Sequence, residues 1–407
     1  MDLDLAWQLL CAALVIFMTP GLAFFYGGLV KSKSVVSMMM LSFGSMMIVT
    51  ILWVLYGASG IGAISEPNQL VGNPFQDFGL TELMSGIGEG EAGNAFGGIA
   101  FGASFAIITV ALISGAVADR ARFWPWILFA GIWVTLVYFP GQAWVWAFDD
   151  EGPLGWILGK GVLDWAGGTI VHQAAGAAAL ALALVLGRRK AGFSKEEAQP
   201  HNVPLVLIGA SILWFGWFGF NTGVYGADLG QTSLIFLNTL ITPAAAMLGF
   251  LVVEQLKDGK ATAVGAASGI VAGLVAITPA CAHLDPVWAL LLGVIAGAVC
   301  CFAIDLKYVL GYDDTLDVVG IHLVAGFIGC VYLGFFATVG GEGVLMGGDF
   351  EFLFWQVASS LIVIAWAFVV AFAVGWAIEK TVGFRAKEED ELAGIDQVLH
   401  GDGYAIN

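Results

Sequence analysis

Charge is scarce in this chain of 407 residues. Asp, Glu, Lys and Arg together make up 12% of it, about half of their share in an ordinary soluble domain. Hydrophobic residues make up 59%, and the mean hydropathy is +0.88. These values exclude an ordinary soluble protein and point to a chain that lies largely within a membrane.

Cysteine and histidine are also few, at five residues each. All five cysteines lie within or at the edge of apolar runs, and their odd number argues against a disulfide framework. Only two histidines lie deep inside such runs, and no third histidine lies at the same depth to complete a metal site. We therefore expect no metal and no cofactor, and interpret the cysteines as small packing residues.

Apolar runs recur along the whole length, most of them near the roughly 20 residues that a spanning helix needs. The eleven predicted spans are about 6–30, 35–63, 95–118, 123–147, 162–187, 203–222, 231–255, 261–281, 286–304, 316–339 and 352–379. The sequence thus predicts an all-α integral membrane domain over residues 1–379 and a polar tail over 380–407. The first run is too long, and too acidic at its start, for a cleaved signal peptide.

Basic residues predict the orientation of these spans. Of the 15 Lys and Arg residues, all except Lys160 fall in one set of alternate connections. Positively charged loops favour the cytoplasmic side. We therefore expect a multi-pass protein of the cell (inner or plasma) membrane, with its N-terminus outside and its C-terminus inside, which requires an odd number of spans.

Two segments repeat a pattern: DWAGGTIVH over 164–172 and DTLDVVGIH over 314–322. Each is the start of the fifth span in a unit of five, so the chain is predicted to hold two repeats, about 6–187 and 203–339. Because five is odd, the second repeat runs inverted, and such repeats place their site near the bilayer midplane. The last span, 352–379, lies outside the repeat and is expected to brace it.

The histidines His172 and His322 end these two segments. Eight residues of helix cover about 12 Å, so each histidine lies near the middle of a bilayer about 30 Å thick. Ionisable residues at that depth usually serve a pathway. Two neutral imidazoles share one proton between ring nitrogens and line a pore that passes a small hydrogen-bonding molecule or a proton. The alternative is two core histidines, each bonded to a backbone carbonyl.

Aspartate and aromatic residues supply the other candidates. Asp164 and Asp314 each begin a helix, where a carboxylate caps free N–H groups; we expect a structural role for Asp314 and a mixed structural and cation-stabilising role for Asp164. Aromatic residues gather at the predicted outer ends of three spans, where they form either an interfacial belt or a cation–π site for a small cation. They are Phe101, Phe105, Trp144, Trp146, Trp217, Phe218 and Phe220.

The chain resembles the Amt/MEP/Rh family of ammonium transporters, in particular its bacterial and archaeal Amt branch. Beyond the two histidine segments, the resemblance rests on an ordered set of motifs that extends over nearly the whole chain: FFYGG at 24–28, ASFAIITVALISGAVADR at 103–120, GWFGFNTG at 216–223, SGIVAGLVAITPAC at 268–281 and GIDQVLHG at 394–401.

The resemblance implies a homotrimer in the lipid bilayer with one pore per subunit, and a transporter rather than an enzyme. It implies that His172 and His322 are the pore histidines and that Phe105 and Phe220 form a stacked gate. Ammonium recruitment would fall to Trp146, Phe101, Phe105 and Asp164. The ion would be deprotonated there and pass as ammonia, with or without its proton. The tail would help to dock a PII-type signalling protein, and no nucleic-acid partner is expected.

Three positions depart from the family pattern: Val224, Gln173 and Gly102. Transporting members usually have a serine that hydrogen-bonds ammonium where this chain has Val224. Loss of a hydrogen bond to a charged group costs about 1.5–3 kcal/mol, so affinity for the ion would fall. This keeps a second hypothesis open: an ammonium sensor that signals through its C-terminal region or through a signalling domain fused after Asn407.

Overall fold

The computed structural model describes residues 3–87, 91–190, 192–195, 199–224, 226–401 and 403, and side chains from residue 95 onward in the helix that begins at Glu91. The last residues of the predicted tail, 402 and 404–407, therefore lie outside the described residues. The described chain is mainly helical, with a single two-stranded hairpin, β1 (Phe148–Asp149) and β2 (Gly152–Pro153).

The α-helices, in chain order, are α1 (Leu3–Leu29), α2 (Val35–Leu52), α3 (Thr81–Ser85), α4 (Glu91–Ile113), α5 (Phe123–Trp133), α6 (Phe139–Trp146), α7 (Ala174–Leu186), α8 (Val203–Thr222), α9 (Leu229–Asp258), α10 (Ala263–Ile277), α11 (Pro286–Ala303), α12 (Leu306–Leu310), α13 (Val324–Phe336), α14 (Phe350–Thr381) and α15 (Glu388–Ala393). The π-helical segments are η1 (Trp53–Ile61), η4 (Val134–Tyr138), η6 (Gly168–Gln173), η7 (Val319–Leu323) and η9 (Asp396–His400). Short 3-10 turns are η2 (Phe78–Leu80), η3 (Ser114–Val117), η5 (Leu158–Lys160) and η8 (Val344–Met346).

Among the described residues, ten helices are long and apolar enough to cross a membrane, and α10 is a shorter apolar helix of 15 residues. Each predicted span coincides with one of these eleven. The prediction of a helical membrane protein is confirmed, and the count of eleven spans stays a prediction because α10 is short.

Several helices begin where the sequence offers a capping side chain. Asn202, Asp228, Thr262 and Asp349 each accept a hydrogen bond from the backbone N–H three residues on. Such caps satisfy donors that the first helical turn leaves free. These capping side chains therefore mark the residues at which the four helices begin.

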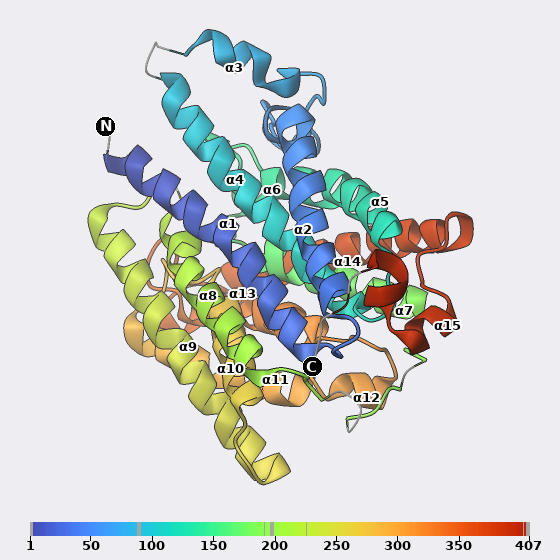
Figure 1. The fold of residues 1–407 in the computed structure, drawn as a ribbon. Coiled ribbons are helices and arrows are strands. Elements are labelled where there is room, and N and C mark those ends of the chain that lie inside the picture. Colours follow the sequence, from blue (N-terminus) through green and yellow to red (C-terminus); the bar gives the residue numbers. More distant parts are fainter. Residues whose placement is uncertain are drawn as a thin grey trace.

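The helices form one bundle in which α1 lies beside α8 and α4, and α9 beside α11 (Figure 1). α3 lies at one end of the bundle, whereas α12 and α15 lie towards the other (Figure 1). Glycines allow the closest crossings: a Cβ at Gly209 would clash with the backbone of Phe25, and one at Gly249 with the backbone of Val294. Small residues of this kind let membrane helices approach each other and pack.

The tail folds back onto the bundle. The carboxylate of Asp396 accepts hydrogen bonds from the backbone N–H groups of Val36 and Ser37, at 3.0 and 2.7 Å, in the first turn of α2. Arg385 pairs with Glu391 at 2.7 Å and donates to the carbonyl of Leu186 at the end of α7. The tail therefore contacts the ends of helices from both the start and the middle of the chain.

Candidate functional site

The two predicted pore histidines meet at the centre of the bundle. Nδ1 of His172 lies 3.2 Å from Nδ1 of His322, and the ring centroids are 5.3 Å apart. Both side chains are buried, with exposures of 1% and 3%. One neutral imidazole must donate and the other accept for this contact to be a hydrogen bond. Among the described residues, Nε2 of His172 has no hydrogen-bond partner.

Each histidine lies in a π-helical segment that runs directly into an α-helix: η6 continues as α7, and η7 continues as α13. A π-turn adds a residue to the helical turn and often occurs at functional sites. The two matching sequence segments therefore share a local conformation as well as a spacing. Their symmetry extends to the backbone.

Two phenyl rings stack on one side of the histidines. Phe105 of α4 and Phe220 of α8 have centroids 4.0 Å apart and planes inclined by 14°. The Phe220 ring also lies 6.2 Å from the ring of His172. Both phenylalanines are buried. Any molecule that reaches the histidines along this line has to displace or pass these rings.

Trp217 is a site residue that the sequence grouped with the outer aromatic residues. Its ring stacks on His172, with centroids 5.4 Å apart and planes inclined by 19°. Its indole N–H donates to the hydroxyl of Thr278 at 2.8 Å. Trp217 precedes Phe220 by one helical turn, and residues at this spacing share a helix face. That spacing was the signal available in the sequence.

The other aromatic residues of the predicted recruitment site adjoin the stacked rings. The Phe101 ring lies 4.8 Å from that of Phe105, and the Trp146 ring lies 6.0 Å from Phe105 at 85°. Trp146 donates its indole N–H to the carbonyl of Asp164 at 2.8 Å. The half-buried Val224 follows Gly223, where a Cβ would lie 2.6 Å from the Phe101 ring. The structure thus brings together the predicted recruitment residues other than Val224, whose neighbour Gly223 lies against the Phe101 ring.

The carboxylate of Asp164 is committed to its own chain. Oδ1 accepts from the backbone N–H groups of Gly167 and Gly168, at 3.0 and 2.6 Å. Oδ2 accepts from the backbone N–H of Thr169 at 2.8 Å and from its hydroxyl. These four bonds close the start of η6. The side chain acts as a helix cap that fixes the segment bearing His172.

A small, mostly apolar cavity surrounds the two histidines and extends to the Phe220 ring. Its lining consists of Met18, Leu22, Phe25, Ile108, Leu112, His172, Leu213, Trp217, Phe220, Val271 and His322. The two imidazoles and the indole are the only polar side chains in that set. Among the described residues, no group of three His, Cys, Asp or Glu residues is placed to hold a metal ion.

Asp314 caps the second histidine segment less completely than Asp164 caps the first. It accepts from the backbone N–H of Val319 at 2.7 Å. Burial raises its pKa to about 6, although the Lys307 ammonium opposes that rise and Asp317 adds to it. Lys307 donates to the carbonyl of Asp314 at 2.8 Å and pairs with Asp317 at 2.6 Å. This cluster holds the start of η7.

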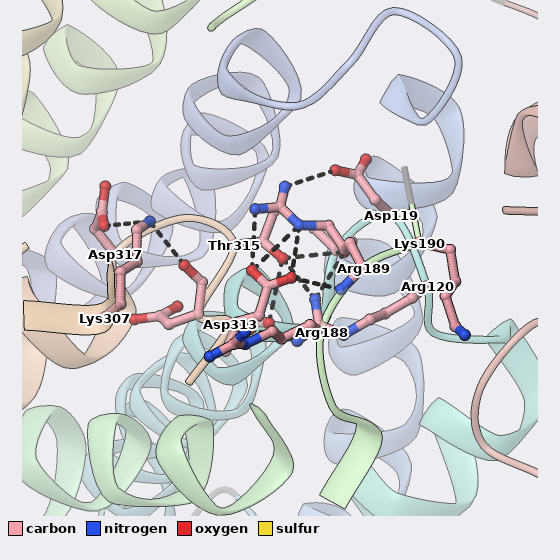
Figure 2. A network of polar contacts seen from close by, with 12 residues as sticks. Asp119, Arg120, Arg188, Arg189, Lys190, Lys307, Asp313, Thr315 and Asp317 are labelled. Atoms are coloured by element: carbon pink, nitrogen blue, oxygen red, sulfur yellow. Dashed lines mark hydrogen bonds and ion pairs between the residues drawn. The ribbon is translucent and has the colours of Figure 1, made fainter. Parts of the chain in front are cut away.

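A buried ion network adjoins that cluster (Figure 2). Arg189 lies between Asp119, at 3.2 Å, and Asp313, at 3.0 Å. Arg120 donates to the hydroxyl of Thr315 at 2.7 Å and to the carbonyl of Asp313. Burial alone would raise the pKa of Asp313, but the two guanidinium groups lower it below its usual value. Buried charges need such pairing, and here it joins three connections of the chain.

Comparison with known proteins shows the family to which the chain belongs. The family model described as "Ammonium Transporter Family" matches residues 6–404. The chain belongs to the ammonium transporter family. It is 46% identical to the ammonium transporter of Mycobacterium tuberculosis over 98% of this chain and 89% of that one. It is 40% identical to the ammonium transporter of Bacillus subtilis over 98% and 97% of the two chains. The resemblance inferred from the motifs is confirmed.

Solved structures of this family share the same architecture. One titled "Sensor Amt Protein" has a TM-score of 0.89 at 26% identity and covers 98% of both chains. Mep2 of Candida albicans has a TM-score of 0.85 at 30% identity, covering 96% of this chain and 88% of that one. The family thus includes relatives named as transporters and a relative titled as a sensor.

Proposed function

We propose that this protein transports ammonium across a cell membrane. The aromatic group of Phe101, Phe105 and Trp146 recruits the ion by cation–π attraction. Burying the charged ion beyond these rings is costly, so it gives up its proton before it passes the Phe105 and Phe220 gate. Ammonia then hydrogen-bonds along His172 and His322, and the proton either remains outside or follows by the imidazoles.

The observation that carries this proposal is the continuous order of contacts from Phe101 to His322. Aromatic rings, stacked gate and imidazole pair follow one another at distances of 4.0–6.2 Å. An apolar passage excludes hydrated ions, whereas two imidazoles offer one small molecule both a donor and an acceptor. Ammonia fits that combination.

The proposed assembly follows the family. It has eleven spans in two inverted repeats, with the N-terminus outside and the C-terminus in the cytoplasm, and three copies each hold one pore in the bilayer. The tail over 380–407 faces the cytoplasm, where a PII-type protein would bind. The scarcity of basic residues in the other set of connections supports this orientation.

Val224 favours a second function. An isopropyl group offers no acceptor to an N–H of the ion, so a receptor that binds ammonium without passing it would keep the same fold. The structural relative titled as a sensor shows that the architecture is not limited to proteins named transporters. The imidazole pair favours transport, because a sensor has no evident need of a deep polar passage.

Charge movement and internal pH in proteoliposomes after an ammonium jump test the two functions. We compare the wild type with Val224→Ser and His172→Ala. Transport predicts a saturable wild-type signal that His172→Ala abolishes. Val224→Ser restores a hydrogen bond worth about 1.5–3 kcal/mol and should lower the half-saturating concentration about 10- to 100-fold.

A sustained current would indicate that charge accompanies ammonia, whereas a pH change without current would indicate passage of ammonia alone. If purified wild-type protein binds ammonium and yet neither signal appears, transport is wrong and the receptor stands. A Val224→Ser variant with unchanged half-saturation would remove residue 224 from the recruitment site.

A further inference from the structure

Gln173 is a polar residue at the centre of the bundle that the proposed pathway does not use. It follows His172 directly, its side chain is fully buried, and it does not line the cavity that contains both histidines. Burying a carboxamide costs free energy unless its groups are hydrogen-bonded. A leucine or isoleucine would avoid that cost, so the amide calls for an explanation.

The carboxamide joins three elements. Its Nε2 donates to the backbone carbonyl of Gly326 at 3.1 Å and to the hydroxyl of Ser360 at 3.2 Å. Gly326 lies on α13 one helical turn after His322, and Ser360 lies on α14. Thus the residue after one histidine is bonded to the backbone that carries the other.

A matching contact without the hydrogen bond occurs on the other side of the histidine pair. Gly176 lies four residues after His172, as Gly326 does after His322. A Cβ at Gly176 would lie 2.6 Å from the backbone N of Leu323, the residue after His322, and one at Gly326 would lie 3.3 Å from Cγ of Gln173. In both cases a glycine accommodates the residue after the opposite histidine. Only the first contact carries a polar group.

The source of this difference is α14, which lies against η6 and α7. Gln356 and Ser360 are one turn apart on one face of α14, and both are fully buried. Gln356 accepts from the backbone N–H of Leu163 at 3.2 Å and donates to its carbonyl at 3.0 Å. The helix therefore holds the segment that bears His172 at its start, beside Asp164, and at its end, at Gln173.

We propose that Gln173 is a positioning residue: its amide fixes the spacing of His172 and His322 by tying η6 to the backbone of α13 and to Ser360. An aliphatic side chain at position 173 would fill the same space without specifying a register between the two segments. The geometric part of this inference stands on the contacts above. Its consequence for turnover rests on the proposed transport function.

Nitrogen NMR of histidine-labelled protein in lipid nanodiscs tests the geometry without requiring transport. The five histidines are assigned with His172→Ala and His322→Ala. In Gln173→Leu we expect the Nδ1 signals of His172 and His322 to move as their hydrogen bond weakens. Leu323→Met, the matched change at the mirror position, should leave them unmoved.

Flux in proteoliposomes tests the functional consequence. Small misplacements of reacting groups cost large factors in rate, so Gln173→Leu should lower the maximal rate about tenfold. Half-saturation should stay within about twofold of wild type, because the recruitment residues are untouched. Ser360→Ala removes one acceptor and should shift the NMR signals in the same direction by a smaller amount, which tests the inference even if Gln173→Leu fails to fold.

Wild-type Nδ1 signals and wild-type rate in a folded Gln173→Leu protein would overturn the inference and leave Gln173 as packing. Equal effects of Leu323→Met on the NMR signals would also overturn it, because the amide would then not be the cause. If the wild type transports nothing, the proposed function fails, and the NMR comparison alone decides the positioning role.

Discussion

At Asp164, a residue predicted to stabilise a cation proves to have both carboxylate oxygens occupied by its own helix start. Four donors converge on it, from Gly167, Gly168 and Thr169. What remains available to an ion beside Trp146 is the negative charge of the carboxylate at a distance. The geometry therefore favours the structural part of the mixed role expected for this residue.

Asp164→Asn tests that assignment. The amide nitrogen of asparagine would face N–H and O–H groups that need acceptors, and an unsatisfied buried group costs about 1–3 kcal/mol. We expect a lower unfolding temperature together with reduced flux. Thermal unfolding in detergent measures the first effect. Lost transport at wild-type stability would instead mean that the carboxylate acts on the ion.

Most residues of the candidate site could be predicted from the sequence. Those that could not depend on contacts between helices that are far apart in the chain. Apolar runs and a repeated spacing identified His172 and His322, because burial and helical periodicity are local properties. The place of Trp217 against His172, and that of Gln173 against Gly326, depend on which helices become neighbours. Nothing in a single span specifies a contact 153 residues away.

At the scale of elements, hydropathy predicted which segments are helical better than it predicted the length and type of each helix. The run over 261–281 yields the 15-residue helix α10, since the chain turns at Thr278 and Pro279. The π-helical turns η6 and η7 had no sequence signal of their own. Their caps, Asp164 and Asp314, were predictable as caps, although the unequal number of bonds they accept was not.

The burial of Asp314 predicts that the stability of the protein depends on pH. An unfolded aspartate titrates near pH 3.9, whereas Asp314 in the folded protein has a pKa of about 6. The folded state therefore holds the proton more tightly. The resulting stabilisation is complete below about pH 4 and is lost as pH rises through 6, and it amounts to something on the order of 2 kcal/mol.

Asp314→Asn should remove this dependence while its amide oxygen still accepts from Val319. Between pH 4 and 7 the unfolding temperature of the wild type should fall relative to that of the variant. Thermal unfolding at several pH values measures the difference. Parallel curves for the two proteins would show that Asp314 does not titrate in this window.

At the scale of the whole molecule, connections far apart in sequence converge at one end of the bundle. The segments around Asp119, Arg189 and Asp313 share one ion network (Figure 2). The tail joins them, since Arg385 forms a β-bridge with Ala121. All of these connections belong to the lysine- and arginine-rich set, and the aromatic group around Trp146 lies beyond the histidines from them.

The predicted orientation can be tested through one residue, because a single lysine lies in the other set of connections. Lys160 is the single Lys or Arg outside the rich set of connections; it is exposed, with its ammonium 5.0 Å from the Trp355 ring centroid. If loops rich in basic residues face the cytoplasm, a membrane-impermeant amine reagent applied to intact cells should modify Lys160 and no other lysine. Peptide mass spectrometry locates the label.

Lys160→Arg is the matched control, because it keeps the charge over Trp355 and removes the reactive amine. In intact cells, no lysine side chain of this variant should be labelled. Once the membrane is opened, Lys33, Lys195 and Lys260 should become labelled. Modification of these three lysines in sealed cells, with Lys160 protected, would show that the protein has the opposite orientation. The aromatic group would then face the cytoplasm, and the proposed pathway would recruit ammonium from inside the cell.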